Sequence, residues 1–261
     1  MTIHQFGLSF GVVNEYDVKV IGFYPRSEEK TRLVIPPHVD GYRVAEVGKK
    51  AFYECSRLRH VVLPPSVHSI GDEAFGLCSN LEDIVLPESI KHIGKGALEG
   101  SLKLKKVALP RWLDVLPEGL LYDSGVAEVS LPDNITEVPS GCFYDCRNLR
   151  SIILPASVAK VATDAFHYCT ALSEVVAAET IESIEMFDGE RKWQLKTTQR
   201  APKYKVIEDG RVSYTDDYED AVRGIGWTIA MAREGLNTRS FTCEIFDNAT
   251  GELMHREEYR C

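Results

Sequence analysis

The sequence lacks the short motifs that accompany many catalytic and nucleic-acid-binding proteins. It contains no Walker A loop, no GxSxG step, no HExxH pair and no dinucleotide fingerprint. Basic residues are fewer than acidic ones, 30 against 39, and the formal net charge is −9. This balance argues against a general binder of nucleic acid or anionic membranes, which would need a basic surface. We therefore assign no catalytic residue, no metal ligand and no cofactor.

Long apolar runs are also absent. No stretch approaches the roughly 18 apolar residues of a membrane-spanning helix, and residues 1–6 show no basic region followed by an apolar run. The sequence therefore predicts a cytoplasmic protein without membrane association. The seven cysteines include no CxxC pair, so reduced structural thiols are preferred over a disulfide framework or a zinc site. Seven scattered histidines are interpreted as surface residues, with His68 and His92 as the one pair that stacking could bring close.

What the chain does contain is a proline that recurs at a nearly constant interval. Each copy follows an aliphatic residue, and successive prolines are 23, 23, 22 and 23 residues apart. The five steps are Leu63-Pro64, Leu86-Pro87, Leu109-Pro110, Leu131-Pro132 and Leu154-Pro155. An earlier copy, Ile35-Pro36, precedes Pro64 by 28 residues with an insertion around residues 40–43. A fixed period of this length is typical of a repeat solenoid.

Other positions of the unit keep the same phase. A small residue precedes a bulky apolar one, as in Ala74-Phe75, and a cysteine or serine follows three residues later. The members of this cysteine column are Cys55, Cys78, Ser101, Ser124, Cys146 and Cys169. The column is either a redox switch or a ladder of small residues that fills a tight turn, and we prefer the ladder.

Physical constraints then determine the architecture. A unit of about 23 residues cannot bury its own apolar face, so neighbouring copies must stack and share one core. In the strand over residues 81–86, the first, fourth and sixth positions are predicted to point inward, and proline ends the strand because it has no backbone donor. The return segment over residues 67–71 is expected to form a second strand or a turn on the other face.

These residues resemble the BspA-like leucine-rich repeat family, whose motif reads L-x-x-I-x-L-P-x-x-(V/I)-x-x-I-G-x-x-A-F-x-x-C. The copy from Leu58 to Cys78 matches every defined position except Val61, and the resemblance covers residues 31–187. It implies a β-rich solenoid of about six repeats of 22–23 residues, with adhesion or protein-binding roles. Many members are secreted surface proteins, and this chain departs from them in having no evident export signal.

The predicted organisation has four segments. Residues 1–30 form a cap with a hairpin around Asn14-Glu15, and residues 31–188 form the solenoid. Residues 189–203 form a basic linker that could instead contact an anion or a partner. Residues 204–261 form a small α/β appendage of order β-α-β-β, with a helix that begins after Thr215 and ends at Gly235. This appendage is either a further cap or a docking or oligomerisation module.

Two surface columns on the strands are candidates for binding a protein partner. The position between the inward aliphatic residues forms an apolar column of Val62, Val85, Ala108, Ser130, Ile153 and Val176. An exposed column of this kind indicates an interface, although β-branched residues also simply suit strands. The neighbouring charged column begins with His60, Asp83, Lys106 and Glu128, whose opposite charges can pair across strands.

One residue breaks the repeat pattern. The second position after proline is Ser66, Ser89, Trp112, Asn134 and Ser157 in successive copies. Trp112 is either an interface hot spot or a ring that packs locally against Leu113 or Leu116.

The function predicted from these features is a non-catalytic protein-interaction scaffold that uses the strand face. Two alternatives remain open. One is an inhibitor or regulator of a macromolecular machine, of phage or defence origin, acting by acidic mimicry. The other is an enzyme with a site at the C-terminal unit.

Overall fold

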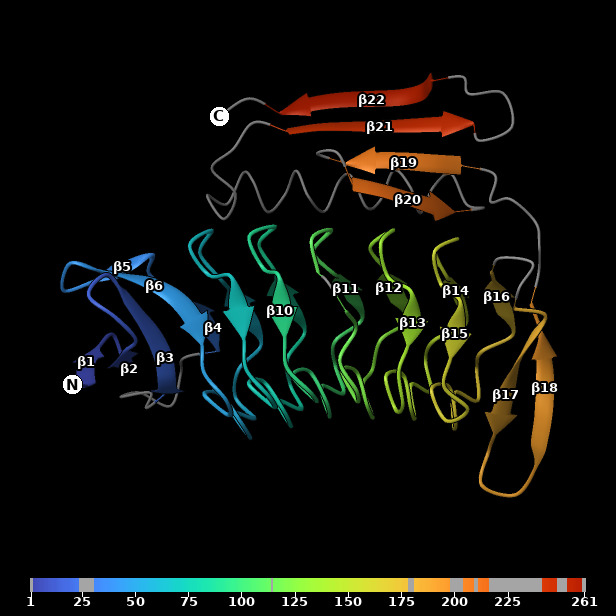
Figure 1. Ribbon diagram of the computed structural model, residues 1–261, viewed down its shortest axis with the longest axis horizontal. Coiled ribbons are helices and arrows are strands. Elements are labelled where there is room, and N and C mark those ends of the chain that lie inside the picture. The colour runs from blue at the N-terminus through green and yellow to red at the C-terminus, as the bar shows by residue number, and fades with distance from the viewer. Residues whose placement is uncertain are drawn as a thin grey trace. The chain divides into compact units, whose positions relative to one another are not determined.

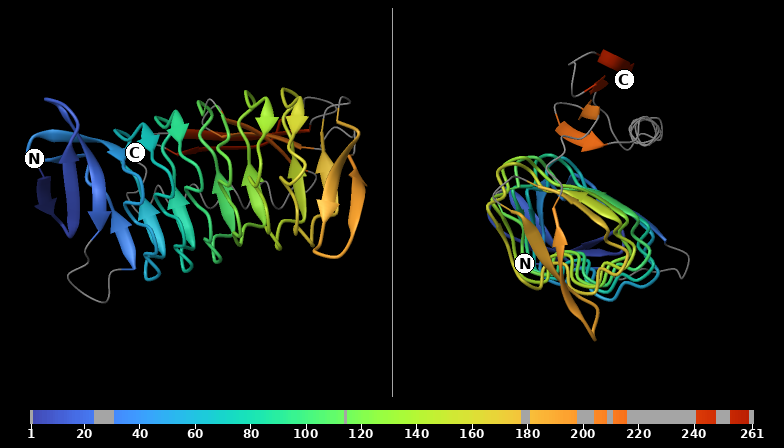
Figure 2. Two further views of the ribbon diagram at one scale, coloured as in Figure 1. Left: turned by 60° about the horizontal axis from the view of Figure 1, so that its bottom comes forward. Right: turned by 90° about the vertical axis from the view of Figure 1, so that its right-hand side faces the viewer.

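The computed structural model describes residues 2–23, 31–113, 115–177, 181–197, 204–208, 211–215, 241–247 and 253–259. The chain divides into two compact units, Met1–Thr198 and Gln199–Cys261. The first unit is a solenoid whose successive coils lie side by side along one axis (Figure 1). Viewed along that axis, the coils superimpose around one interior (Figure 2). The predicted repeat solenoid is confirmed.

One wall of the solenoid, here called the strand face, receives one short strand from each coil. Its strands are β4 (Arg32–Val34), β7 (His60–Val62), β9 (Asp83–Val85), β11 (Lys106–Ala108), β12 (Glu128–Ser130), β14 (Ser151–Ile153) and β16 (Glu174–Val176). They pair in parallel as β4-β7-β9, β11-β12 and β14-β16. In β9 the predicted alternation holds, because Leu81, Ile84 and Leu86 are buried. Successive copies of the unit therefore share one register.

A second set of parallel strands forms the other wall. It contains β6 (Tyr42–Val47), β8 (Ser69–Ile70), β10 (His92–Ile93), β13 (Glu137–Val138) and β15 (Lys160–Val161). These strands pair as β6-β8-β10 and as β13-β15, so the wall is interrupted between β10 and β13. Among the described residues, the expected second strand is confirmed in five of the coils.

The interruption has a backbone cause. Gly71 and Gly94 donate their N–H groups to the carbonyls of Val47 and Ile70, each at 2.8 Å. A Cβ at Gly94 would lie 2.3 Å from the backbone nitrogen of Asp72, so only glycine allows this close approach. In the next two coils the equivalent residues are Pro117 and Pro139, which have no N–H to donate.

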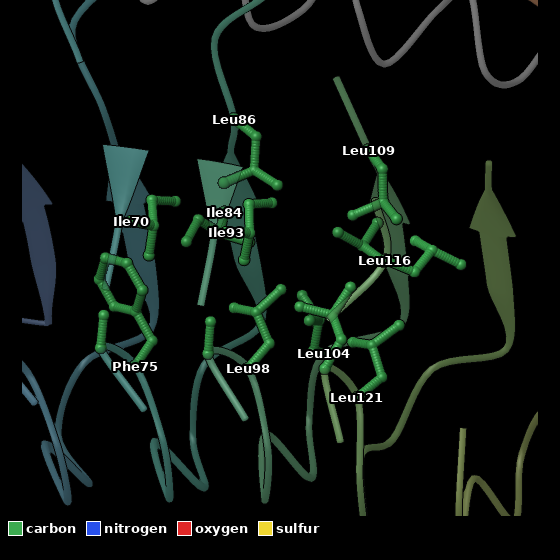
Figure 3. Close-up of a cluster of buried hydrophobic side chains, with 14 of the residues drawn as sticks. Ile70, Phe75, Ile84, Leu86, Ile93, Leu98, Leu104, Leu109, Leu116 and Leu121 are labelled. Carbon is green, nitrogen blue, oxygen red and sulfur yellow. The ribbon is translucent and has the colours of Figure 1, made fainter. Parts of the chain in front are cut away.

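The core runs through all the coils as aligned columns. Figure 3 shows Phe75, Leu98 and Leu121 in one such column, at the same place in three successive coils. The rings of Phe52 and Phe75 stack with centroids 4.9 Å apart. Ala74 and Phe75 are both fully buried, so the Ala-Phe step packs as predicted.

Both ends of the solenoid carry additional strands. At the N-terminal end β2 (Leu8–Val12) and β3 (Asp17–Phe23) form the predicted hairpin, and β1 (Thr2–Gln5) pairs with β2. The strand β5 (His38–Val39) pairs with β6 through the insertion. At the turn, the Asn14 side chain accepts hydrogen bonds from the backbone N–H groups of Tyr16 and Asp17, both at 2.8 Å.

The C-terminal end of the solenoid differs from the prediction. Residues 189–203 were expected to be a linker, but β18 (Lys192–Lys196) pairs antiparallel with β17 (Ser183–Phe187). Regular alternation allows this, because Ile184 and Met186 face the core while the lysines of β18 face outward. The basic composition of the segment therefore marks the outer face of a terminal hairpin.

The second unit contains a four-stranded antiparallel sheet of order β20-β19-β21-β22. Its strands are β19 (Tyr204–Glu208), β20 (Arg211–Thr215), β21 (Phe241–Asp247) and β22 (Leu253–Tyr259). The sequence predicts a strand over residues 204–212 that is interrupted or turned at Asp209-Gly210, and in the structure β19 and β20 pair as antiparallel strands. The helix expected between residues 215 and 235 lies outside the described residues, so the α/β composition of this unit stays a prediction.

Candidate functional site

The apolar column lies on the strand face, but its residues are not equally accessible. Val85, Ile153 and Val176 are half-buried, while Ala108 and Ser130 are exposed. Val62 is only 7% exposed, because it lies between Val34 and Val85 on adjacent strands. The expectation of an open stripe is therefore wrong at Val62. Val34 is exposed and extends the column by one strand.

The charged column pairs laterally, as its opposite charges predict. Lys106 and Glu128 are register partners on β11 and β12, and their side chains form an ion pair at 2.5 Å. His60 and Asp83 occupy the same column on β7 and β9 and are half-buried. The charges of Lys106 and Glu128 are thus neutralised within the chain, so this pair has no unpaired charge with which to bind a partner.

The small polar residues in the turn after each strand link neighbouring repeats. Ser89 Oγ donates to the carbonyl of Val67 at 2.5 Å, and Asn134 Nδ2 donates to the carbonyl of Leu113 at 3.0 Å. Ser157 Oγ lies 2.6 Å from the carbonyl of Ile135. Each of these bonds spans 21 or 22 residues and joins one repeat to the one before.

Trp112 occupies the same position in the repeat that begins at Pro110 (residues 110–131, here called the Pro110 repeat). Its side chain is 57% exposed, whereas Leu113 and Leu116 are buried in the core. The Arg111 guanidinium lies 5.0 Å from the Trp112 ring centroid, and the Arg111 backbone N–H donates to the Glu88 carboxylate at 3.2 Å. The ring is therefore held at the surface by an arginine and is not inserted among the leucines.

A second apolar residue, which was not predicted from the sequence, is exposed in the same turn. Val115 is 59% exposed. In the other repeats this position is occupied by Ser69, His92, Glu137 and Lys160, all polar or charged. A comparison of that column would have revealed it. The Pro110 repeat thus exposes two apolar side chains within four residues, at positions where the other repeats expose polar groups.

The cysteine column behaves as a ladder of small residues. The thiols of Cys78 and Cys169 donate to the carbonyls of Phe52 and Phe143 at 3.1 and 2.9 Å. Burial raises the pKa of Cys78 to about 12. A hydrogen bond with Cys146, together with burial, raises the pKa of Cys169. Buried thiols of this kind are unreactive, which favours the structural interpretation over the redox switch.

Charge on the solenoid is interspersed. Lys49 pairs with Asp72 at 3.3 Å, Lys95 with Glu118 at 2.6 Å, and Lys160 with Glu137 at 3.7 Å, each across neighbouring repeats. A single acidic face would support mimicry of nucleic acid, and this alternation weakens that hypothesis. Among the described residues, no three His, Cys, Asp or Glu side chains are placed to hold a metal ion. That part of the chain also has no helix with the length and apolarity to cross a membrane.

Parallel coils with one strand each, a shared register and an aliphatic-Pro step define a leucine-rich-repeat solenoid. A family model described as "BspA type Leucine rich repeat region" matches six copies over residues 45–173. The chain belongs to the BspA-type leucine-rich-repeat family. A comparison with curated proteins found no match.

Solved structures of bacterial leucine-rich-repeat proteins are similar to this chain. The T. pallidum protein TpLRR is 30% identical, with a TM-score of 0.62 over 72% of this chain and 86% of that one. A leucine-rich cell surface protein of Faecalibacterium prausnitzii is 23% identical, with a TM-score of 0.58 over 70% of this chain and 56% of that one. A Bacteroides ovatus protein is 24% identical, with a TM-score of 0.55 over 69% and 54%. The chain spans about half the length of the latter two, whose likeness shows the fold alone.

Proposed function

We propose that the protein is a non-catalytic scaffold that binds a protein partner through the strand face and the adjoining turn, with Trp112 at the centre of the contact. Membership of a repeat family with protein-binding and surface roles supports the general class. The finer assignment to this surface depends on Trp112, with Val85, Ile153 and Val176 as flanking apolar contacts. The enzyme alternative would place an active site on side chains of the C-terminal unit, most of which lie outside the described residues.

The observation that carries the proposal is the exposure of Trp112 at a position that elsewhere links repeats. Ser89, Asn134 and Ser157 each bond to the preceding repeat there. A tryptophan has only a ring N–H at that position and presents a large apolar surface to solvent. Tryptophan contributes disproportionately to interface energies, because it buries a large area and offers one donor.

Affinity capture from the native host, with quantitative mass spectrometry, tests the proposal. Trp112→Ala and Val85→Glu should each reduce recovery of the same partner, by about tenfold or more for a hot spot of ~2 kcal/mol. Tyr16→Ala is the matched control, because Tyr16 is 73% exposed in the N-terminal hairpin turn, far along the chain from the strand face. Equal recovery with all three variants would remove the strand face from consideration.

A cytoplasmic location, expected from the sequence, is part of the same proposal. The similar F. prausnitzii protein is described as a cell surface protein. A location at the cell surface is therefore the main alternative to the cytoplasm. Fractionation of the native host with an antibody against the chain distinguishes them. Recovery in the cell envelope or the medium would overturn the cytoplasmic assignment and leave the interaction surface to be tested separately.

A further inference from the structure

The turn segment between the second strand and the cysteine column has its own surface columns. One column contains Tyr53, Gly76, Glu99, Tyr122, Tyr144 and His167, whose carbonyls accept a hydrogen bond from the neighbouring coil at every step from Gly76 onward. Three residues earlier in each coil lies a column of Lys50, Glu73, Gly96, Gly119 and Gly141. The first four of these donate their N–H groups to the next coil in the same way. Equivalent positions therefore have equivalent backbones.

Aromatic rings form a ladder over the C-terminal half of this segment. Tyr122 and Tyr144 stack with centroids 4.6 Å apart and planes 4° apart. Tyr144 then contacts Tyr168 at 5.0 Å, and Tyr168 contacts Phe187 at 5.3 Å. Tyr122 is the first ring of the ladder and is 41% exposed. It therefore presents aromatic surface on the side away from Tyr144.

In the first repeat, a lysine occupies the column that contains glycine in later repeats. Lys50 Nζ lies 4.6 Å from the Tyr53 ring centroid and 3.0 Å from the carboxylate of Glu73. The ammonium group thus lies between an aromatic ring and a carboxylate, where the ring quadrupole and the negative charge both attract it. Lys50 takes this position with φ of 55°.

In the Pro110 repeat the residue equivalent to Lys50 is Gly119, with nearly the same φ of 62°. A Cβ at Gly119 would have no atom closer than 3.9 Å, so a side chain could be placed there without a clash. The conformation does not demand glycine, because Lys50 and Glu73 adopt it in their own coils. The chain therefore leaves out the cation here although its backbone would accommodate one.

Carboxylates lie around this open position. The Glu99 carboxylate lies over Gly96, whose Cα is 4.0 Å from where the Cβ of residue 119 would be. Asp123 follows Tyr122 directly and is half-buried, and the charge of Arg147 already acts on it. Burial, followed by the charge of Asp145, raises the pKa of Asp123. A cation here would find an aromatic ring and, on the preceding coil, the Glu99 carboxylate; the residue equivalent to Glu73 on the next coil is Gly141, which has no side chain to pair with it.

We propose that the surface formed by Gly119, Tyr122 and Glu99 binds a lysine or arginine side chain from a basic segment of a partner protein. The incoming cation lies beside the Tyr122 ring on the side of the preceding coil, where Glu99 balances its charge, whereas Lys50 pairs with a carboxylate of the next coil. This surface lies on the turn segments and not on the strand face, so it stands independently of the Trp112 contact. The column structure of the solenoid creates it, because one repeat supplies the ring and its neighbour supplies the carboxylate.

The test uses the full-length chain and an acetylated hexalysine peptide, with affinity measured by isothermal titration calorimetry at 50 and 150 mM salt. Gly119→Lys should supply the missing cation from within the chain and weaken peptide binding by about fivefold. Gly41→Lys is the matched control, because Gly41 also has positive φ, 85°, and no atom within 4 Å of its Cβ position. It adds the same charge elsewhere and should change the affinity less than twofold.

Two further variants separate the ring from general attraction to an acidic chain. Tyr122→Leu should weaken binding by about threefold or more, while Tyr122→Phe should retain it, because phenylalanine keeps the ring face. Thermal melting of each variant checks that the solenoid is intact. Equal weakening by Gly119→Lys and Gly41→Lys, or no binding of hexalysine by the wild-type chain at millimolar peptide, would overturn the proposal. Displacement of the peptide by a neutral oligosaccharide would also overturn it, in favour of a carbohydrate ligand.

Discussion

The cysteine column makes a quantitative prediction about one serine. Ser101 is fully buried and its hydroxyl has no hydrogen-bond partner. At the same position Cys78 and Cys169 donate to a carbonyl 26 residues earlier. A cysteine at position 101 would place its thiol toward the equivalent carbonyl, that of Phe75. We therefore predict that Ser101→Cys stabilises the solenoid.

The magnitude follows from the cost of a buried hydroxyl without a partner, about 1–3 kcal/mol. A thiol has little of this desolvation cost and fills slightly more of the core. Overpacking opposes the gain, but the other coils accommodate cysteine at this position with the same backbone. The expected net gain is about 1–2 kcal/mol. At roughly 2–4 °C per kcal/mol for a chain of this size, the melting temperature should rise by about 2–8 °C.

Ser124→Cys provides the matched control for this experiment. Ser124 occupies the same column one coil further along, but its hydroxyl lies 3.4 Å from the Cys146 sulfur and has a partner. Its replacement should change stability by less than ~0.5 kcal/mol. Both variants are measured by differential scanning calorimetry under reducing conditions. The reasoning is refuted if Ser101→Cys melts no higher than the wild type, or if Ser124→Cys gains as much.

Three further predictions use the same fold. Phe75→Ala should lower the free energy of unfolding, measured in urea, by about 3–5 kcal/mol. Phe75→Leu should lower it by less than about 1.5 kcal/mol, because Leu98 already fills this column in the next coil. Equal losses would contradict the column packing. In the native protein, site-resolved alkylation should modify the half-buried Cys55 well before the buried Cys78, Cys146 and Cys169, and fast labelling of Cys146 would revive the redox interpretation. A hydrogen bond from Arg43 lowers the pKa of Asp17 below its ordinary value of 3.8, so this pair stabilises the fold above that pH and the stabilisation is lost as the pH falls below it. The free energy of unfolding of Asp17→Asn should therefore fall less between pH 5 and pH 2 than that of the wild type. An equal fall in the two proteins would count against the pairing.

Positions that face the core were predictable from the sequence because the repeat period fixes them. Leu81, Ile84 and Leu86 had to be buried if coils stack, and they are. The cysteine column was predictable for the same reason, since equal spacing implies equal environment. Equal spacing also predicted the pairing of Lys106 with Glu128, because register partners on parallel strands face each other.

Features that depend on side-chain conformation or on the ends of the solenoid were not predictable in this way. The basic composition of residues 189–203 concealed the strand β18, because a terminal hairpin needs only one apolar face. The burial of Val62 depends on its neighbours Val34 and Val85 and not on its own column position. The tyrosine ladder was missed because Tyr122 and Tyr144 lie outside the core columns, where the period carries no strong requirement.

The Pro110 repeat departs from the pattern on its outward side. It carries Trp112 and Val115 where other coils carry polar residues, and Pro117 takes the place of the second-wall glycine. Gly119 and Tyr122 keep residue types that recur at Gly96, Gly141 and Tyr144. The core positions of the Pro110 repeat follow the pattern, because Leu113, Leu116 and Leu121 are all buried.

A coil that keeps its core but presents Trp112 and Val115 where other coils present polar residues fits the binding surface proposed above. Trp112 and Tyr122 lie ten residues apart on different parts of that coil, so they present two surfaces to solvent. The partner of the solenoid should therefore be sought as one that engages this coil, and variants on either side of it should weaken binding independently if two contacts are made.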